Sequence, residues 1–327
     1  MKDFQTKDNG LKGKTVVITG ASSGVGLATA EAFANEGCNV VLVARGQKGL
    51  DAATENCRRY PIKAISISAD MSNADDVEKV ALEALTINGK IDIWVNNAGV
   101  MASGKFEEIP MEIHQQVIKT NLFGYMHGAY NAIKIFKKQN EGILINNVSI
   151  GGFMPAPYSA VYSATKYGIR GMMECLQGEI SNHKNIHISN LYPQLQNSTG
   201  NLHSAKYSGF DITIPFIASD PRDTAAAIVN LAKNPKKDHF PDLKAAALTK
   251  TYKMFPKTVM NTASAALRLK MKMNHNKQNN PGNVLENSEE PLRVYGNPNL
   301  NKTSPLTITL FAGIAVSTAL LFLNKKF

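Results

Sequence analysis

Short apolar runs alternate with longer helical stretches from Thr15 onward, and this alternation constrains the fold more than any other feature of the sequence. Most of the runs are continuously apolar, as expected for strands buried on both faces of a parallel sheet. Strands that alternate with helices form βαβ units and a doubly wound α/β fold. The expected strands are Thr15–Thr19, Asn39–Ala44, Ala64–Ser68, Ile91–Asn96, Gly142–Val148 and Ile186–Leu191. The expected helices include Leu27–Glu36, Ala74–Thr86, Met111–Lys137 and Tyr158–Ser181.

The composition is that of an ordinary globular protein, with 43% hydrophobic and 19% charged residues in 327. It excludes collagen, a disulfide scaffold and global disorder. The three cysteines form no CxxC pair and suit a reducing compartment, and the seven histidines show no ligand spacing, so no metal site is predicted. We expect a polar tail over residues 1–11, without the apolar stretch of a secretory signal, and one α/β domain over residues 12–245.

Positive charge is concentrated after this domain. The net charge is +10, and the stretch from Lys233 to Lys277 holds eleven Lys or Arg against two acids. Residues 246–273 are predicted to form a basic, Met-rich amphipathic helix, whose pattern starts near Leu243 and breaks at Pro256. Such a segment is either a solvated helix face or a surface for nucleic acid or an anionic membrane. No nucleic-acid motif accompanies it, so no nucleic-acid partner is predicted.

The C-terminal end is predicted to be a linker followed by a membrane anchor. Residues 274–305 contain nine Asn and four Pro, a composition expected of a disordered linker. Leu306–Leu323 has 18 residues without a charge and would be about 27 Å long as a helix, close to the thickness of a bilayer core. A buried or partner-docking helix is the alternative. The lysines on both sides do not decide the orientation. The prediction is a single-pass anchor with the domain in the cytoplasm.

A glycine-rich loop follows the first strand and leads into a helix. Its glycines, Gly20, Gly24 and Gly26, let the backbone turn tightly and approach a phosphate. The N-terminus of the helix offers free N–H groups, and Ser22 and Ser23 add hydroxyl groups. This context predicts a dinucleotide site, with a glycine-rich turn that binds no ligand as the alternative.

The ends of the second and third strands bear on the choice of dinucleotide. An acid at the end of the second strand would favour NAD by bonding the ribose hydroxyls, but Ala44 and Arg45 stand there. A guanidinium suits a 2′-phosphate, so NADP(H) is predicted, with a solvated arginine as the alternative. Asp70 ends the third strand and is either an adenine contact or a helix-capping residue.

Three further motifs follow later strands. The fourth strand ends in Asn96-Asn97-Ala98-Gly99, the fifth ends at Ser149, and the stretch Tyr162-Ser163-Ala164-Thr165-Lys166 comes next. A Tyr and a Lys four residues apart share one face of a helix. An ammonium group near a phenol lowers the phenol's pKa, so that the phenol can exchange a proton with a substrate oxygen.

Together, the TGxxxGxG, NNAG and YxxxK motifs and the serine resemble the short-chain dehydrogenase/reductase family over residues 12–245. The resemblance implies a Rossmann-like fold with Tyr162 as general acid and base. It also implies that Lys166 tunes Tyr162 and holds the nicotinamide ribose, that Ser149 binds the substrate oxygen, and that Asn121 holds a water in the proton relay. Asn97, Gly99 and Pro193 would line the cofactor cleft. The family's habit of pairing its fourth and fifth helices suggests a homo-oligomer.

Two departures from the family pattern concern the substrate side. Gln194 follows Pro193 where the family has Gly, with Ser198 or Thr199 as the nearest hydroxyl, so the fit of the nicotinamide ring is in question. The usual Gly-Gly pair of the last strand is absent, and His239-Phe240-Pro241 stands there. Tyr207, Phe210, Ile212, Ile214 and Phe216 predict an apolar lid over a lipophilic substrate.

The predicted function is NADP(H)-dependent interconversion of a carbonyl and an alcohol on a small molecule. Two alternatives remain. One is a non-catalytic NADP-binding sensor or scaffold at the membrane, which would have no need of the complete set Asn121, Ser149, Tyr162 and Lys166. The other is an epimerase or dehydratase on nucleotide sugars, which usually requires a larger C-terminal domain.

Overall fold

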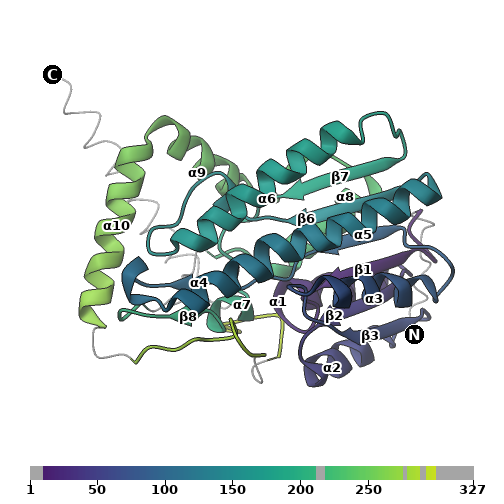
Figure 1. The fold of residues 1–327 in the computed structure, drawn as a ribbon, viewed down its shortest axis with the longest axis horizontal. Coiled ribbons are helices and arrows are strands. Elements are labelled where there is room, and N and C mark those ends of the chain that lie inside the picture. Colours follow the sequence, from purple (N-terminus) through teal and green to yellow (C-terminus); the bar gives the residue numbers. More distant parts are fainter. Residues whose placement is uncertain (1–9, 211–217, 275–277, 288–291, 300–327) are drawn as a thin grey trace.

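A seven-stranded, wholly parallel sheet forms the centre of the protein. The computed structural model describes residues 10–210, 218–274, 278–287 and 292–299 (Figure 1). The strand order is β3-β2-β1-β4-β6-β7-β9. The strands are β1 (Thr15–Thr19), β2 (Asn39–Ala44), β3 (Ala64–Ser68), β4 (Ile93–Asn96), β6 (Gly142–Asn147), β7 (Ile186–Leu191) and β9 (Asp238–His239). The predicted doubly wound fold is confirmed, and β9 lies where the sequence departs from the family pattern.

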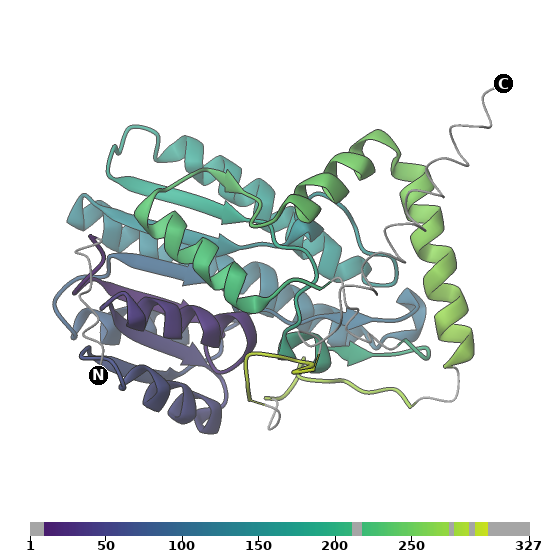
Figure 2. The same cartoon turned by 180° about the vertical axis from the view of Figure 1, so that it is seen from behind.

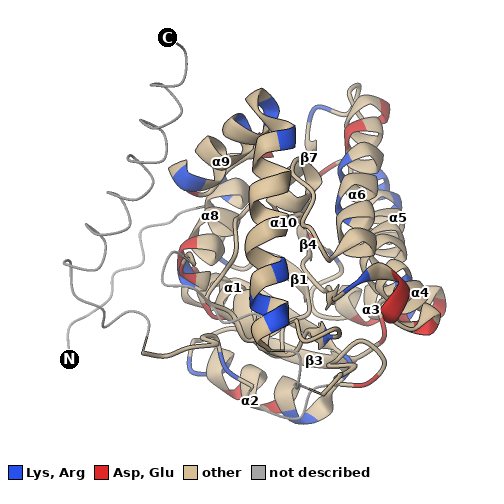
Figure 3. Ribbon diagram, turned by 90° about the vertical axis from the view of Figure 1, so that its left-hand side faces the viewer, with Lys and Arg blue, Asp and Glu red and all other residues tan. Residues whose placement is uncertain are grey.

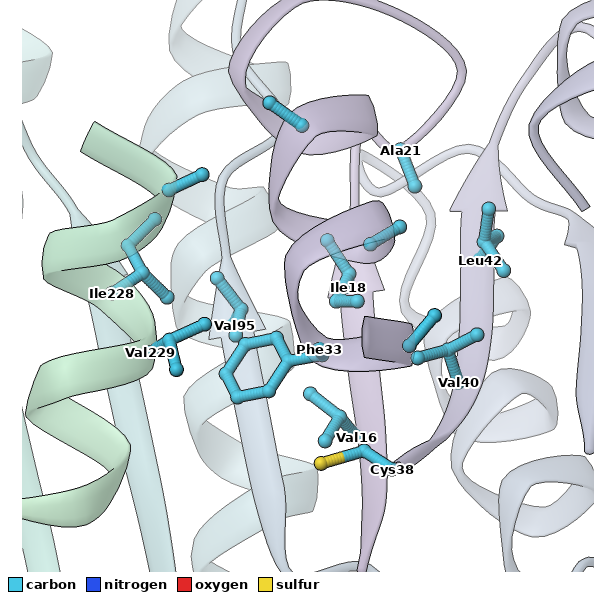
Figure 4. Close-up of a cluster of buried hydrophobic side chains, with 14 of the residues drawn as sticks. Val16, Ile18, Ala21, Phe33, Cys38, Val40, Leu42, Val95, Ile228 and Val229 are labelled. Atoms are coloured by element: carbon cyan, nitrogen blue, oxygen red, sulfur yellow. The ribbon is translucent and has the colours of Figure 1, made fainter. Parts of the chain in front are cut away.

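Helices cover both faces of the sheet (Figures 1 and 2). One face carries α1 (Gly24–Asn35), α2 (Gln47–Cys57) and α8 (Pro221–Lys233), and the other carries α3 (Ala74–Leu85), α5 (Gly124–Gln139) and α6 (Ala160–Glu179). Figure 4 shows the first face, where Phe33 of α1 and Val229 of α8 pack against Val16 and Val95 of the strands. Leu11, predicted to belong to the tail, is only 2% exposed and packs in this core.

The predicted helix Met111–Lys137 is interrupted in the structure. It consists of α4 (Met111–Ile118), a π-helical turn η2 (Lys119–Phe123) and α5. A π turn inserts an extra residue into the helix and often marks a functional position. It carries Asn121, which is fully buried.

Buried amide side chains connect four neighbouring strands. Asn96 of β4 donates to Asn146 of β6 at 3.0 Å, and Asn146 donates to Asn190 of β7 at 3.2 Å. Asn190 in turn donates to Asp238 of β9 at 3.4 Å. The three asparagines are at most 1% exposed. Because buried amides need partners, these bonds favour one pairing register and align the ends of the strands.

A second, two-stranded sheet and two basic helices lie beyond the main sheet. β5 (Ala102–Ser103) pairs with β8 (Ala205–Lys206), and the short helix α7 (Thr199–Leu202) precedes β8. The predicted basic segment forms α9 (Leu243–Met254) and α10 (Pro256–Met273), with the break at Pro256 as expected. Neither helix contains an acidic residue, and Figure 3, in which α10 faces the viewer, shows Lys and Arg but no acid along both.

The prediction of a disordered linker is wrong for the described part of residues 274–305. Val284 is fully buried and Val294 is 6% exposed, each within a hydrophobic cluster of the domain. Asn280 pairs with Lys206, and Tyr295 pairs with Ser198. Two apolar anchors and backbone pairing thus hold an Asn- and Pro-rich segment that a composition argument assigns to disorder.

The predicted anchor, residues 306–323, lies outside the described residues, and so do residues 1–9. Among the helices that the structure describes, none is both long enough and apolar enough to span a bilayer. The anchor therefore stays a prediction.

Candidate active site

A cavity of about 430 Å³ opens at the carboxyl edge of the sheet, where ligands bind in doubly wound folds. The loops after β1, β2, β3, β4, β6 and β7 surround it. The cavity brings together nearly all residues that the sequence predicts for the site, namely Gly20, Ser22, Ser23, Gly24, Gly26, Arg45, Asp70, Asn97, Gly99, Ser149, Tyr162, Lys166 and Pro193. Within the described residues, no cluster of three or more His, Cys, Asp or Glu could hold a metal ion.

The glycine-rich loop is shaped by close contacts that only glycine permits. Gly24, the first residue of α1, has φ +57°, which L side chains rarely adopt. A Cβ on Gly26 would lie 2.0 Å from the carbonyl oxygen of Gly20. The Ser23 side chain makes no capping hydrogen bond to α1. The loop therefore presents the N-terminus of α1 to the cavity, in the geometry that binds anions.

Asn97 holds this loop against the next strand. Its side-chain amide donates to the carbonyl oxygen of Thr19 at 2.9 Å and accepts from Asn147 at 2.9 Å. Its backbone N–H donates to the hydroxyl of Thr19 at 2.9 Å. Asn97 therefore connects the ends of β1, β4 and β6 at the floor of the cavity.

Arg45 and Asp70 line the cavity at the ends of β2 and β3, the side where the sequence predicts the adenosine half of the dinucleotide, here called the adenosine side. Burial lowers the pKa of Arg45, and the negative charge of Asp70 acts in the opposite direction. The Asp70 carboxylate accepts from the backbone N–H of Ser72 at 2.8 Å, while Asn73 caps α3. Asp70 therefore closes a turn and is not the N-cap of α3, and its contact with adenine stays a prediction.

Tyr162 and Lys166 lie on one face of α6, next to Ser149. The Nζ atom of Lys166 is 5.6 Å from the ring centroid of Tyr162 and 5.0 Å from that of Tyr125, and the lysine is 5% exposed. Ser149 has φ +93°, a strained conformation for a residue with a side chain. Such strain persists where the surroundings impose it, and it concentrates at active sites.

The pKa pattern differs from the prediction that Lys166 lowers the pKa of Tyr162. Burial raises the pKa of Tyr162, and a side-chain hydrogen bond with Ser149 lowers it in part. Burial lowers the pKa of Lys166 to about 7. Near neutral pH, Lys166 is thus only partly charged, and Ser149 is the side chain that favours the phenolate of Tyr162.

Asn121 does not line the cavity but lies behind its wall. Its side chain accepts from the backbone N–H of Val100 at 2.8 Å and donates to the carbonyl oxygen of the same residue at 2.9 Å. It also donates to the hydroxyl of Thr165 at 3.2 Å. In the structure it joins the loop after β4 to α6, one residue before Lys166.

The substrate side contains the departures from the family pattern. Gln194 lines the cavity, and its amide donates to the Ser219 hydroxyl at 2.8 Å. Ser198 also lines the cavity, whereas the Thr199 hydroxyl donates to the carbonyl oxygen of Arg293 at 2.9 Å. Of the predicted apolar lid, Tyr207 and Phe210 are buried outside the cavity wall. Residues 212, 214 and 216 lie outside the described residues.

Among the cavity residues that sequence reasoning missed, Asn283, Asn287 and Leu292 come from the C-terminal part of the chain. They belong to the segment predicted to be a linker. No motif or periodicity marks them, and the buried Val284 and Val294 beside them are too isolated to signal a packed segment.

The fold is a doubly wound α/β fold with a cavity at the carboxyl edge of its sheet, and comparison with known proteins identifies the family. The family model for short chain dehydrogenases matches residues 14–206. The uncharacterized oxidoreductase YxnA of Bacillus subtilis is 30% identical over 252 residues, covering 76% of this chain and 70% of YxnA. The 3beta-hydroxysteroid dehydrogenase 1 of Eggerthella lenta is 33% identical over 236 residues, covering 68% of this chain and 88% of the relative.

A solved structure agrees. The L-sorbose reductase of Gluconobacter frateurii, complexed with NADPH and L-sorbose, has a TM-score of 0.63 and 27% identity, covering 72% of this chain and 97% of the reductase. The chain therefore belongs to the short-chain dehydrogenase/reductase family. It is an oxidoreductase of the class that acts on alcohol or carbonyl groups.

The lowered pKa of Lys166 predicts a pH-dependent cost in stability. Since the pKa is lower in the folded state, the unfolded chain binds more protons between about pH 7 and 10.5, and stability rises with pH in that range. The stability gained by a Lys166→Met variant should therefore shrink by about 2 kcal/mol from pH 7 to pH 9. Chemical denaturation at both pH values measures it, with Lys137→Met as an exposed control. A gain that is equal at both pH values would show that Lys166 is not desolvated.

Proposed function

We propose that the protein is an NADP(H)-dependent carbonyl reductase, or the corresponding alcohol dehydrogenase, with Tyr162 as its general acid and base. The observation that carries this proposal is that Ser149, Tyr162 and Lys166 line one cavity together, with the Lys166 Nζ atom 5.6 Å from the ring centroid of Tyr162. The cavity residues fit a dinucleotide, because the glycine-rich loop leaves no room for side chains and Arg45 adds a cation. The bound cofactor would supply or accept the hydride.

In the reductive direction, the Tyr162 hydroxyl gives its proton to the carbonyl oxygen of the substrate as that oxygen gains negative charge. Ser149 donates a hydrogen bond to the same oxygen and holds the carbonyl in place. Lys166, with a pKa near 7, can return a proton to Tyr162. In the oxidative direction, Tyr162 takes the proton from the alcohol. Burial raises the pKa of Tyr162 and so keeps a proton on its hydroxyl, next to the substrate oxygen that receives it.

NADP(H) is proposed over NAD(H) because of the end of β2. Ala44 and Arg45 line the cavity where an acid would bond the ribose hydroxyls. A guanidinium there can bond a 2′-phosphate through two parallel N–H groups. The similar L-sorbose reductase was solved in complex with NADPH, and this likeness supports the choice.

A lipophilic carbonyl compound or alcohol is proposed as substrate. Apolar side chains contribute to the cavity wall, namely Val100, Met101, Met154 and Leu195. An apolar wall with few polar groups favours an apolar ligand. The relative whose name specifies a hydroxysteroid points to the same chemical class.

A Tyr162→Phe variant is expected to bind NADPH as the wild type does and to lose turnover about 100-fold or more, because the acid is removed while the cavity stays. Steady-state rates with a panel of ketones and aldehydes, together with NADPH titrations, measure both. Tyr130→Phe, on the exposed side of α5 (63% exposed), is the control. Wild-type rates in Tyr162→Phe would show that another group donates the proton.

An Arg45→Ala variant should raise the ratio of the NADPH to the NADH dissociation constant about 10- to 100-fold, as expected for loss of charged hydrogen bonds. Taking the ratio removes effects common to both nucleotides. Arg58→Ala, at a surface ion pair with Glu55, is the control. An unchanged ratio would exclude Arg45 as the 2′-phosphate ligand.

We also propose that residues 306–323 anchor the protein in a membrane, with the catalytic domain in the cytoplasm. Exposed Met254 and Phe255 at the corner between α9 and α10, among basic residues, support a position near an anionic surface. Full-length protein is expected in the membrane fraction, and a chain lacking residues 303–327 in the soluble fraction. Full-length protein found only in the soluble fraction would contradict the anchor. The homo-oligomer stays a prediction, which the exposed side chains of Phe123 in η2 and of Met126 and Tyr130 in α5 support.

A further inference from the structure

One segment after α10 crosses the adenosine side of the cavity. We call residues 280–287 and 292–297 the C-terminal strap. Figure 2 shows it in yellow-green, running from the lower end of α10 towards the loops beside α1 and α2. Its residues Asn283, Asn287 and Leu292 line the cavity.

The strap is held at both ends by apolar anchors and backbone bonds. In its first part, Val284 is fully buried beside the small sheet, and the N–H of Asn283 donates to the carbonyl oxygen of His203 at 2.8 Å. In its second part, Val294 is 6% exposed, and the N–H of Gly296 donates to the carbonyl oxygen of Asn197 at 3.1 Å.

At and next to the first anchor, carbonyl oxygens of the strap accept hydrogen bonds from the guanidinium of Arg45. One terminal nitrogen of Arg45 donates to the carbonyl oxygens of Asn283 and, at 3.1 Å, of Glu286. The other donates to the carbonyl oxygen of Val284 at 3.3 Å. Both N–H groups of the first nitrogen are thereby engaged, and one of the second.

The strap also engages the glycine-rich loop. The N–H of Gly24, at the start of α1, donates to the carbonyl oxygen of Arg293 at 3.0 Å. The Leu292 side chain packs at Gly49 and Asn287 packs at Gly46, where a Cβ would meet them at 3.1 Å and 3.4 Å. The strap thus reaches both the end of β2 and the N-terminus of α1.

These contacts involve the donors that phosphate groups need. A carbonyl oxygen and a phosphate oxygen both accept hydrogen bonds, so they compete for the same N–H, and placed side by side they repel. We propose that the C-terminal strap is an intramolecular competitor for the phosphates of the dinucleotide, so that NADP(H) binds by displacing it from Arg45 and Gly24. This inference rests on the proposed function. The apparent dissociation constant would then be the intrinsic one divided by the fraction of molecules with the strap displaced.

Loosening the anchors should therefore tighten cofactor binding. A Val284→Ala/Val294→Ala variant shortens both anchors without touching a cavity residue, and it should lower the NADPH dissociation constant about tenfold. The NADH dissociation constant should fall by a smaller factor. NADH lacks the 2′-phosphate that competes with the strap at Arg45, so for NADH only the competition at Gly24 is relieved. Leu285→Ala, at a strap side chain that is 46% exposed, is the matched control and should leave both constants unchanged. Calorimetric titration of the full-length chains measures them.

Hydrogen exchange in the wild-type protein gives a second test that does not depend on the variant's folding. Saturating NADPH should increase exchange at the strap amides, including those of Asn283 and Gly296. Strap amides that stay protected with NADPH bound, or a double variant whose dissociation constant is unchanged or higher, would overturn the competition. The cofactor would then bind with the strap in place. If wild type and double variant both bind no nicotinamide nucleotide, the proposed function itself fails.

Discussion

The row of buried side-chain amides across β4, β6 and β7 is the constraint on which the site depends. Asn96, Asn146 and Asn190 bond one another in sequence across the sheet, at positions that are in register in the strand pairs. A shift of one residue in any of these pairs would leave buried amides without partners. The same register brings the loops that contain Asn97, Ser149 and Pro193 to one edge of the sheet, where the cavity forms.

The chemistry then follows from burying a phenol and an amine beside one another. Burial favours the neutral form of each group. It raises the pKa of Tyr162, which therefore keeps its proton, and it lowers the pKa of Lys166, which therefore loses its proton more easily. For Lys166, this costs on the order of 4 kcal/mol of folding free energy at neutral pH. A neutral acid that can be reprotonated by a neighbour with a pKa near 7 suits proton transfer to a developing alkoxide. The burial that suits Tyr162 and Lys166 to proton transfer thus also lowers the stability of the folded protein.

Much of the fold and most of the site could be predicted because particular residue types and spacings indicate the strands and the cavity. Apolar runs located β1, β2, β3 and β7 to the residue, and glycines and the Tyr–Lys spacing located the cavity. The π turn at Asn121 could not be predicted, because one inserted residue leaves the helical pattern of Met111–Lys137 nearly unchanged. The strap was missed because it acts through backbone carbonyl oxygens, which every residue has, while its Asn and Pro content is typical of disorder.

The central claim is that a hydride moves from the nicotinamide ring to a carbonyl carbon beside Tyr162. Single-turnover reactions with NADPH deuterated at C4, in either configuration, test it most directly across a panel of lipophilic ketones and aldehydes. The account predicts deuterium on the carbinol carbon of the product from one of the two labelled cofactors, with the hydroxyl proton drawn from solvent. NADPH that binds the protein but transfers no deuterium to any carbonyl compound would contradict it.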